Sequence, residues 1–406
     1  MRIVHVMNWY IPGMGYQENF LQAEQKRLGH DVKIVASTQL PSDLWPQFLP
    51  PEISHDSLLK EKTSEENGVM IYRTRGYRFR DSALVLNLGV VKKLRELKPD
   101  VVQAHGAFTI SALISILYSR RLNYSIFVDD HCHERYTNTT TPLMRIYLRF
   151  VRMFLRFFGD RVGRFMPINE SSKAVLQKVL KVPENQIQIV PLGVQTSRFT
   201  KSAKMKAQGR KTIGVGEGEF LVIFAGKLDV HKKVELLMKA FSEVAAKDAS
   251  MRLLILGSGP GSTGLKRTAD SLGIADRTKF MDLVPNSELP LYYNAADLGI
   301  WPSSPTITVL EAVCTGLPVI VPDDEPAYKI LYENHAVTTF ERGNVESLAK
   351  AIERLVKDES LRSSLSSAGL SLGREVLSWT KIAGETIEIY SSGVQEVAGP
   401  GKDAVR

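Results

Sequence analysis

Short apolar segments alternate with helical segments twice along this chain, and this alternation restricts the possible folds more than any other feature. The first series begins with "RIVHVM" at residues 2–7 and the second with "FLVIFAGKL" at 220–228. Apolar strands that alternate with helices favour a parallel sheet covered by helices on both faces. We therefore predict an α/β protein with two tandem, doubly wound, Rossmann-like domains that face a cleft.

A polar, glycine-rich and lysine-rich stretch at 201–219, "KSAKMKAQGRKTIGVGEGE", interrupts the rhythm and indicates the domain boundary. The length of 406 residues also exceeds the size at which one hydrophobic core usually keeps growing. We assign residues 1–195 to the first domain and 196–378 to the second. Residues 379–393 are expected to form a helix that packs back toward the first domain, and 394–406 a frayed tail.

The composition is that of a globular protein, and the charge favours an anionic partner. Hydrophobic residues make up 44% of the chain, charged residues 24%, and the formal net charge is +8. The apolar segment at the start is too short for a signal peptide, and no run approaches the ~18 apolar residues of a membrane span. We expect a cytoplasmic protein, with a peripheral position at the inner face of the membrane as an alternative.

Glu311 is the one charge in the segment "SSPTITVLEAVCTGLPVIV". A buried carboxylate without a partner is costly, so Glu311 should reach water or bind something. Ser304 suits a helix N-cap and Pro305 the first helical position, so the amides near Thr306 and Ile307 would form a phosphate site. A diphosphate there would leave its sugar near Glu311. Alternatively, Glu311 reaches solvent from a half-exposed helix.

Two lysines follow the first strand of the second series in "FAGKLDVHKK". Lys227 comes directly after Gly226, and Lys232 is expected at the beginning of the next helix. Ligands of doubly wound sheets bind at the carboxyl ends of strands, so both ammonium groups could flank a diphosphate. The segment is no Walker loop, because no Ser or Thr follows "GK". A lysine at a strand end can equally be a solvated surface charge.

Two histidines stand at the ends of neighbouring strands in the first series, His105 in "DVVQAHG" and His131 in "YSIFVDDH". This placement indicates a shared cleft mouth. Cys132 and His133 follow His131, but adjacent loop residues seldom chelate one ion together, and we predict no metal site.

The segment "PLMRIYLRFVRMFLRFF" predicts a helix with an arginine stripe formed by Arg145, Arg149, Arg152 and Arg156. Such a helix could rest on anionic lipid headgroups. Alternatively, its aromatic residues face the core and its arginines face water. No nucleic-acid motif accompanies the positive charge, so nucleic acid is not expected as a partner.

In their order and spacing these segments resemble glycosyltransferase family 4, retaining enzymes of the GT-B fold that use nucleotide-sugar donors. The resemblance covers nearly the whole chain. It implies that residues 1–195 bind the acceptor and 196–378 the donor. The motifs that carry it are "GMGYQE", "LGHDV", "PDVVQAHG", "PLGVQTSRF", "FAGKLDVHKK", "LLILGSGP", "KFMDLVPNSELPLYYNAADLGIWPS" and "LEAVCTGLPVIVP".

The resemblance also implies roles for individual residues. Lys227 and Lys232 would bind the diphosphate, Glu311 the ribose, and His105 would lie near the reacting face of the sugar. Further donor contacts would come from the remaining positions that match, which are Gly13, Gly15, Gly226, Leu283, Val284, Ser304, Thr306 and Ile307. The chain departs from the family at Ser303, where members often have a first glutamate that touches the donor sugar.

The function implied by the resemblance is transfer of a hexosyl unit, with retention, from a UDP- or GDP-sugar to a glycan or lipid-linked acceptor in cell-surface polysaccharide or glycoconjugate synthesis. Neither a metal nor a cofactor is expected, and the expected partners are the nucleotide sugar, the acceptor and an anionic membrane surface. Two alternatives remain open, a non-catalytic nucleotide-sugar or lipid-binding protein of the same fold and a nucleotide-sugar epimerase. The donor base, the sugar, the linkage and the oligomeric state are not fixed by the sequence.

Overall fold

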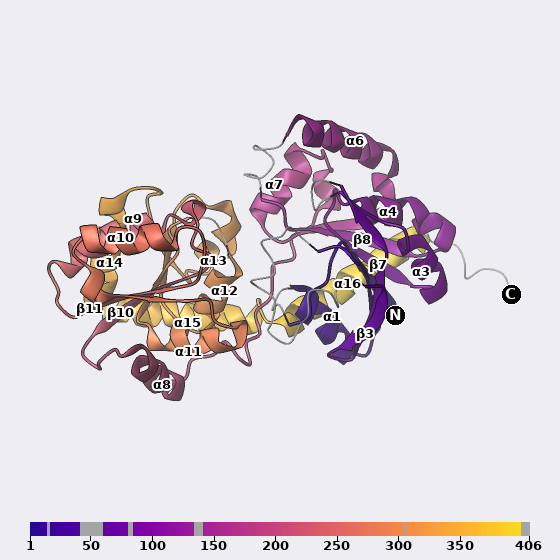
Figure 1. The fold of residues 1–406 in the computed structure, drawn as a ribbon. Helices are drawn as coiled ribbons and strands as arrows, with labels where there is room; N and C mark the ends of the chain where they lie inside the picture. Colours follow the sequence, from indigo (N-terminus) through magenta and orange to yellow (C-terminus); the bar gives the residue numbers. More distant parts are fainter. Residues whose placement is uncertain (14–16, 41–59, 80–83, 134–140, 304–305, 399–406) are drawn as a thin grey trace. The chain divides into compact units, whose positions relative to one another are not determined.

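The computed structural model describes residues 1–13, 17–40, 60–79, 84–133, 141–303 and 306–398. The chain divides into two compact units (Figure 1). Unit 1 comprises Met1–Gly193 and Trp379–Arg406, and unit 2 comprises Val194–Ser378.

Unit 1 is built on a seven-stranded sheet of order β3-β4-β2-β1-β7-β8-β9. All neighbouring strands are parallel except β3, which runs antiparallel to β4. A separate two-stranded sheet joins β5 and β6. The strands are β1 (Arg2–Met7), β2 (Asp31–Ser37), β3 (Lys62–Glu66), β4 (Val69–Thr74), β5 (Gly76–Arg78), β6 (Val85–Asn87), β7 (Val101–His105), β8 (Ser125–Asp130) and β9 (Val162–Pro167).

The helices of unit 1 cover this sheet, and one of them lies at the end of the described part of the chain. The last helix, α16, packs against α1, β8 and β9, and Tyr390 is buried among the apolar residues of that core. The helix extends to Ala398, so the end that we expected at residue 393 falls inside it. The helices are α1 (Gln17–Arg27), α3 (Val90–Leu97), α4 (Ile110–Leu122), α6 (Pro142–Phe158), α7 (Glu170–Lys178) and α16 (Trp379–Ala398).

Unit 2 has a six-stranded, fully parallel sheet of order β12-β11-β10-β13-β14-β15. Its four inner strands are mostly apolar and buried because helices cover both faces, whereas the edge strands β12 and β15 contain polar residues. The strands are β10 (Phe220–Ala225), β11 (Met251–Leu256), β12 (Thr278–Met281), β13 (Leu298–Ile300), β14 (Val319–Pro322) and β15 (Thr338–Phe340). The helices are α8 (Ala203–Ile213), α9 (Val234–Ala245), α10 (Ser262–Ser271), α11 (Leu289–Ala295), α12 (Ile307–Cys314), α13 (Lys329–Glu333), α14 (Val345–Lys357) and α15 (Glu359–Glu375).

Both sheets therefore confirm the predicted doubly wound α/β architecture, and each contains a point at which the strand order reverses. In unit 1 this point lies between β1 and β7, and in unit 2 it lies between β10 and β13. Ligands of open α/β sheets bind beyond the carboxyl ends of the strands at such a reversal. Among the described residues, no helix combines the length and the apolarity needed to cross a bilayer.

Candidate functional site

The chain that leaves β10 at the reversal point of unit 2 carries both predicted lysines. Lys227 is half-buried and directly follows Gly226. Lys232 is also half-buried, but it ends a 3-10 turn, Val230–Lys232, rather than beginning the next helix as expected. Asp229 caps that turn by accepting a hydrogen bond from the amide of His231 at 2.9 Å. The turn therefore holds Lys232 close after the strand, ahead of α9.

Close backbone contact between two strand-end loops fixes the start of this segment. A Cβ atom on Gly257 would lie 1.9 Å from the carbonyl oxygen of Gly226, and the φ angle of Gly257 is +147°. Only glycine fits such an approach. The glycines of "LILGSGPG" therefore serve the packing of the β10 loop against the β11 loop.

The connection from β13 to α12 lies against the same segment. The hydroxyl of Ser303, which stands where the family often has a glutamate, donates a hydrogen bond of 2.6 Å to the carbonyl of His231. Trp301 Nε1 and Thr308 Oγ1 donate to the carbonyl of Ala225, at 2.9 and 3.2 Å. These bonds tie the loop that carries Lys232 to the beginning of α12.

Helix α12 begins later than predicted. Its N-cap is Thr306 in an extended conformation, and its first helical residue is Ile307, whereas the sequence suggested an N-cap at Ser304. Ser304 lies outside the described residues, as does Gly15. The first amides of a helix have no acceptor within the helix, so those of the first turn of α12 are directed out of its N-terminus.

Glu311 is buried one turn into α12, with 3% of its surface exposed. Asn286 Nδ2 donates a hydrogen bond of 2.7 Å to Glu311 Oε1, while the buried Oε2 has no hydrogen-bond partner among the described residues. Burial raises the pKa of this carboxyl to about 7, against the opposing effects of Asn286 and of the positive charge of Arg198. The alternative of a solvent-reaching glutamate is therefore wrong.

Asn286 and Arg198 could not be predicted as neighbours of Glu311, because both lie far from it along the chain. Leu283 and Val284, predicted near the base, belong to the loop after β12. The side chain of Leu283 is exposed and its amide donates to Ser258 Oγ at 3.3 Å, while Val284 packs partly against the core of unit 2.

In unit 1, the predicted histidine lies in a buried polar cluster at the carboxyl ends of β1, β7 and β8. His105 is 8% exposed. Its Nε2 lies 3.0 Å from His5 Nδ1, and its Nδ1 lies 2.7 Å from Asp129 Oδ2. Both ring nitrogens of His105 therefore face protein groups. His131 also faces Asp129, at 3.9 Å, with 35% of its side chain exposed, so His131 is the imidazole through which the cluster reaches the surface.

The cluster shifts the titration of its members in different directions. Burial, together with the neighbouring His105, lowers the pKa of His5 to about 3, so His5 is neutral. Burial alone would raise the pKa of Asp129, but His105 and His131 hold it well below its usual range. Burial also opposes the charge on His131, but Asp129 outweighs that effect and raises the pKa of His131 to about 9.

The geometry assembles a possible cation-binding group that the sequence did not suggest. One ligand atom each from His105, Asp129 and His131 lies within 4.8 Å of the others. Gln103 Nε2 also donates to Asp129 Oδ2 at 2.7 Å. Asp129 Oδ2 is therefore engaged by a hydrogen-bond donor and an imidazole, whereas Asp129 Oδ1 is buried without a hydrogen-bond partner among the described residues.

Gly13, predicted near the donor phosphates, adopts a φ angle of +68° in the turn after β1. Its amide donates a hydrogen bond of 2.9 Å to Glu66 Oε1 on the edge strand β3, and Tyr10 donates to the other oxygen of Glu66. In this structure the amide of Gly13 is therefore satisfied by a carboxylate.

The four arginines predicted at a membrane all lie exposed on α6.

Two family models match the chain. The model described as Glycosyltransferase Family 4 matches residues 20–198, and the model described as Glycosyl transferases group 1 matches residues 205–371.

Relatives and solved structures agree with these matches. An uncharacterised glycosyltransferase of Methanocaldococcus jannaschii is 25% identical over 80% of this chain and 85% of its own length. An alpha-monoglucosyldiacylglycerol synthase of Acholeplasma laidlawii is 25% identical over 58% of this chain, which spans 61% of that protein. The structure of Anabaena Alr3699/HepE, solved with UDP, superposes with a TM-score of 0.73 at 15% identity, covering 97% of this chain and all of that one.

Proposed function

The chain belongs to glycosyltransferase family 4 and has the GT-B fold, and from that premise we propose that it transfers a hexosyl unit from a UDP- or GDP-sugar to a glycan or lipid-linked acceptor. The observation that carries the proposal is the environment of Glu311. A buried carboxylate oxygen without a partner costs free energy unless a ligand supplies hydrogen-bond donors. The vicinal hydroxyls of a ribose supply two.

The rest of the donor-binding site follows from its position in unit 2. Lys227 and Lys232 leave the sheet at the reversal of strand order, and Ser303 ties their loop to the start of α12. A diphosphate bound there would face two ammonium groups and the positive end of a helix. The ribose attached to it would then extend toward Glu311, one turn further along α12.

These fixed positive charges would also serve the reaction. When the glycosidic bond to the donor breaks, negative charge accumulates on the departing diphosphate, and preorganised cations and amides stabilise it. We therefore propose a mechanism that needs no metal ion. We also propose that the anomeric configuration is retained, and the family resemblance supports this.

Within unit 1, we propose that His131 is the group of the histidine cluster that contacts a ligand, while Asp129 holds it in position. A pKa of about 9 keeps His131 positively charged at neutral pH. We assign His105 a positioning role, since both of its ring nitrogens are engaged within the protein.

The acceptor is proposed to be lipid-linked and the site of action the inner face of a membrane. Two relatives support this by their names, the diacylglycerol-modifying synthase above and a phosphatidylinositol monomannoside mannosyltransferase of Mycolicibacterium smegmatis, 25% identical over 52% of this chain. The net charge of +8 favours such an anionic surface.

The proposal is tested by incubating the purified protein with UDP-, GDP- and ADP-sugars and measuring nucleotide release with and without lipid extracts. Thermal shifts with the free nucleotides identify the base, because a ligand at 100 times its dissociation constant adds about 2.7 kcal/mol of stability. Nucleotide binding without any transfer would favour a non-catalytic binding protein, for which Ser303 in place of a sugar-contacting glutamate is the specific support. Interconversion of the sugar without transfer would favour an epimerase.

A further inference from the structure

Helix α6 exposes an apolar face to solvent, which the surface of a soluble protein does not require. Its core-facing side is apolar, as expected, and includes the buried Val151 and Leu155. Its solvent-facing side is apolar as well, with exposed fractions between 48% and 68%. The exposed apolar face consists of Leu143, Ile146, Phe150, Met153 and Phe157. The spacing of three and four residues places these five side chains on one stripe.

The arginines form a second exposed stripe beside the apolar face. At 3.6 residues per turn, the stripe of Arg145, Arg149, Arg152 and Arg156 lies roughly a third of a turn around the helix from the exposed apolar face. The helix contains no Asp or Glu. None of the four arginine side chains makes an ion pair with another residue in the described part of the chain.

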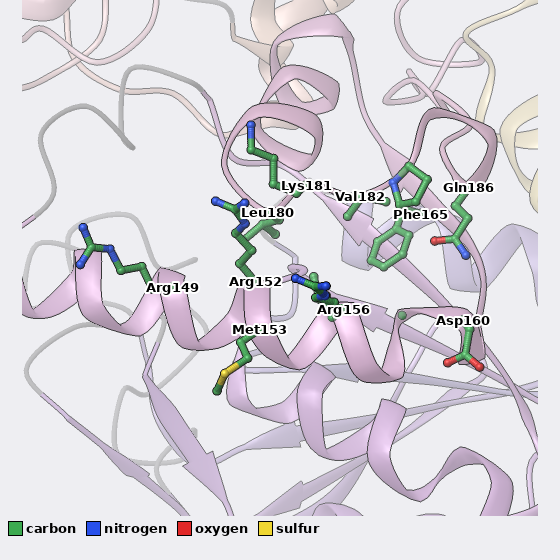
Figure 2. Close-up of a pocket in the computed structure, with 13 residues that line it drawn as sticks. Arg149, Arg152, Met153, Arg156, Asp160, Phe165, Leu180, Lys181, Val182 and Gln186 are labelled. Atoms are coloured by element: carbon green, nitrogen blue, oxygen red, sulfur yellow. The ribbon is translucent and has the colours of Figure 1, made fainter.

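A cavity of about 760 Å³ opens between the arginine stripe and the segment that follows α7 (Figure 2). Arg149, Arg152 and Arg156 line it from the helix, and Lys181 lines it from the opposite side. The side chains of Arg152 and Lys181 both line this space, and Met153 contributes an apolar side chain to the same lining (Figure 2). Ligand pockets have volumes of about 300 to 1,000 Å³, so this cavity is large enough for a headgroup.

The charge of the cavity is strongly positive. Asp160 is the one acidic residue in its lining, and it already forms an ion pair of 3.0 Å with Arg120. Val182, Pro183 and Phe165 supply apolar wall. Lys181 is held at a φ angle of +59°, in the left-handed region that favours glycine.

We propose that α6 is a membrane-docking surface, and that the cavity beside it binds the phosphate of one anionic phospholipid headgroup. The exposed apolar face would lie among the acyl chains nearest the headgroups, with α6 parallel to the membrane. The arginines would then lie at the depth of the phosphates. Arginine suits this contact because its planar fork donates two hydrogen bonds to one phosphate group.

The adjoining apolar face is the reason to choose a lipid over a soluble anion. Free phosphate or a nucleotide would use the cations and leave five large apolar side chains in water. A lipid matches both features, because its charged phosphate suits the cavity and its acyl chains suit the apolar face. The inference rests on the geometry of α6 and not on the transfer reaction.

Sedimentation with vesicles tests the proposal on the full chain without any donor. We expect binding to vesicles of phosphatidylcholine with phosphatidylglycerol, and little binding to phosphatidylcholine alone. Arg145 supplies a matched control, because it lies on the same stripe but does not line the cavity. Arg145→Gln should weaken binding about five-fold, the general effect of one charge near a membrane. Arg152→Gln, Arg156→Gln and Lys181→Gly should each weaken it more than ten-fold.

The Lys181→Gly variant separates binding from folding, because it removes a cation while relieving the left-handed backbone, so its melting temperature should not fall. Equal losses in Arg145→Gln and Arg152→Gln would overturn the headgroup site, since they would show attraction by net charge alone. Inorganic phosphate provides a second test. If it abolished binding to neutral and to charged vesicles equally, the headgroup site would also be overturned, because the cavity would then bind a soluble anion.

The apolar face has its own test. Phe150→Ser with Phe157→Ser should reduce vesicle binding more than ten-fold, whereas Leu28→Ser with Leu117→Ser, exposed apolar residues elsewhere in unit 1, should change it less than two-fold. Equal effects would overturn docking through α6. Nucleotide binding by the same variants should be unchanged, so a failure of this inference and a failure of the proposed function are distinguishable.

Discussion

Asn286 Nδ2 donates a hydrogen bond of 2.7 Å to Glu311 Oε1, and the second carboxylate oxygen of Glu311 remains buried without a partner among the described residues. Asn286 thus fixes the carboxylate and leaves one oxygen for a ligand. We predict that Glu311→Ala lowers nucleotide affinity about 100-fold, the effect of two hydrogen bonds to a charged group. Calorimetry with UDP and GDP checks this, with Glu243→Ala on the surface of α9 as the control. Unchanged affinity in Glu311→Ala would show that the carboxylate has a structural role only.

The titration of Glu311 predicts a pH dependence of stability. Burial raises its pKa to about 7, against 4.5 for the free side chain, so the folded state binds more protons than the unfolded state between these values. Stability contributed by the neutral carboxyl is therefore lost as the pH rises from about 4.5 through 7. Glu311→Gln should remove this dependence. Denaturant unfolding at several pH values measures it, and parallel curves for the two proteins would contradict the assignment.

The same group predicts that nucleotide affinity rises with pH. Ribose hydroxyls donate to an ionised carboxylate, so binding should strengthen from pH 6 to pH 8 and should release protons. In Glu311→Gln the contribution of the carboxyl to this profile should be lost, so that only the ionisation of the terminal phosphate remains. Calorimetry in buffers of different ionisation enthalpy detects the released protons.

The two lysines are predicted to act on the diphosphate and not on the nucleoside. Lys227→Ala and Lys232→Ala should each lower turnover by about two orders of magnitude through lost stabilisation of the leaving group. Both variants should lose affinity for UDP or GDP while binding the nucleoside as well as the wild type does. Lys239→Ala, on the exposed side of α9, is the control. Equal loss of nucleoside and nucleotide binding would mean that the lysines support the fold.

The histidine cluster predicts different outcomes for two substitutions. His131→Ala should reduce turnover about 100-fold, and above about pH 9, where the charge of His131 no longer stabilises the fold, its melting temperature should match that of the wild type. His105→Ala should destabilise the fold by about 1–3 kcal/mol, since it removes one buried partner of His5 and one of Asp129 while Gln25 and Gln103 remain. The raised pKa of His131 also predicts stability that is present below pH 6.5 and is lost as the pH rises through about 9. The reverse pattern, a stable but inactive His105→Ala, would restore His105 as the catalytic group.

Removal of metal ions with a chelator tests the proposal that fixed positive charges of the protein, and not a metal ion, stabilise the departing diphosphate. Turnover should be unchanged after dialysis against EDTA, and the purified protein should contain less than stoichiometric metal. Metal-dependent turnover that is lost in Asp129→Asn would instead identify His105, Asp129 and His131 as ligands.

The alternating pattern was sufficient to predict two doubly wound sheets, because buried parallel strands require continuous apolar runs, but it did not predict β4, the antiparallel edge strand β3 or the edge strand β15. The end of α16 was misplaced, since the helix continues through Gly393, where we expected it to end, to Ala398. The beginning of α12 was misplaced because Ser304 and Pro305 both satisfy local rules for a helix start. The extended Thr306 begins the helix instead.

The residues of the donor-binding site that directly follow strand ends were predictable from the sequence. The residues that reach the site from distant parts of the chain were not. Lys227 and Glu311 could be selected from their place in the pattern, but Asn286, which holds Glu311, comes from another loop. The burial of His105 was likewise hidden, because it depends on His5 and Asp129 from two other strands. On α6 both sides are apolar, so periodicity alone could not decide which one faces the core.

The account depends most on the claim that unit 2 holds a nucleoside diphosphate, and a crystal structure with UDP or GDP tests it directly. We predict density for a diphosphate between Lys227, Lys232 and the first turn of α12, with the ribose hydroxyls within hydrogen-bond distance of Glu311 Oε2. A nucleotide bound elsewhere, or a ribose that leaves Glu311 Oε2 without a partner, would contradict it.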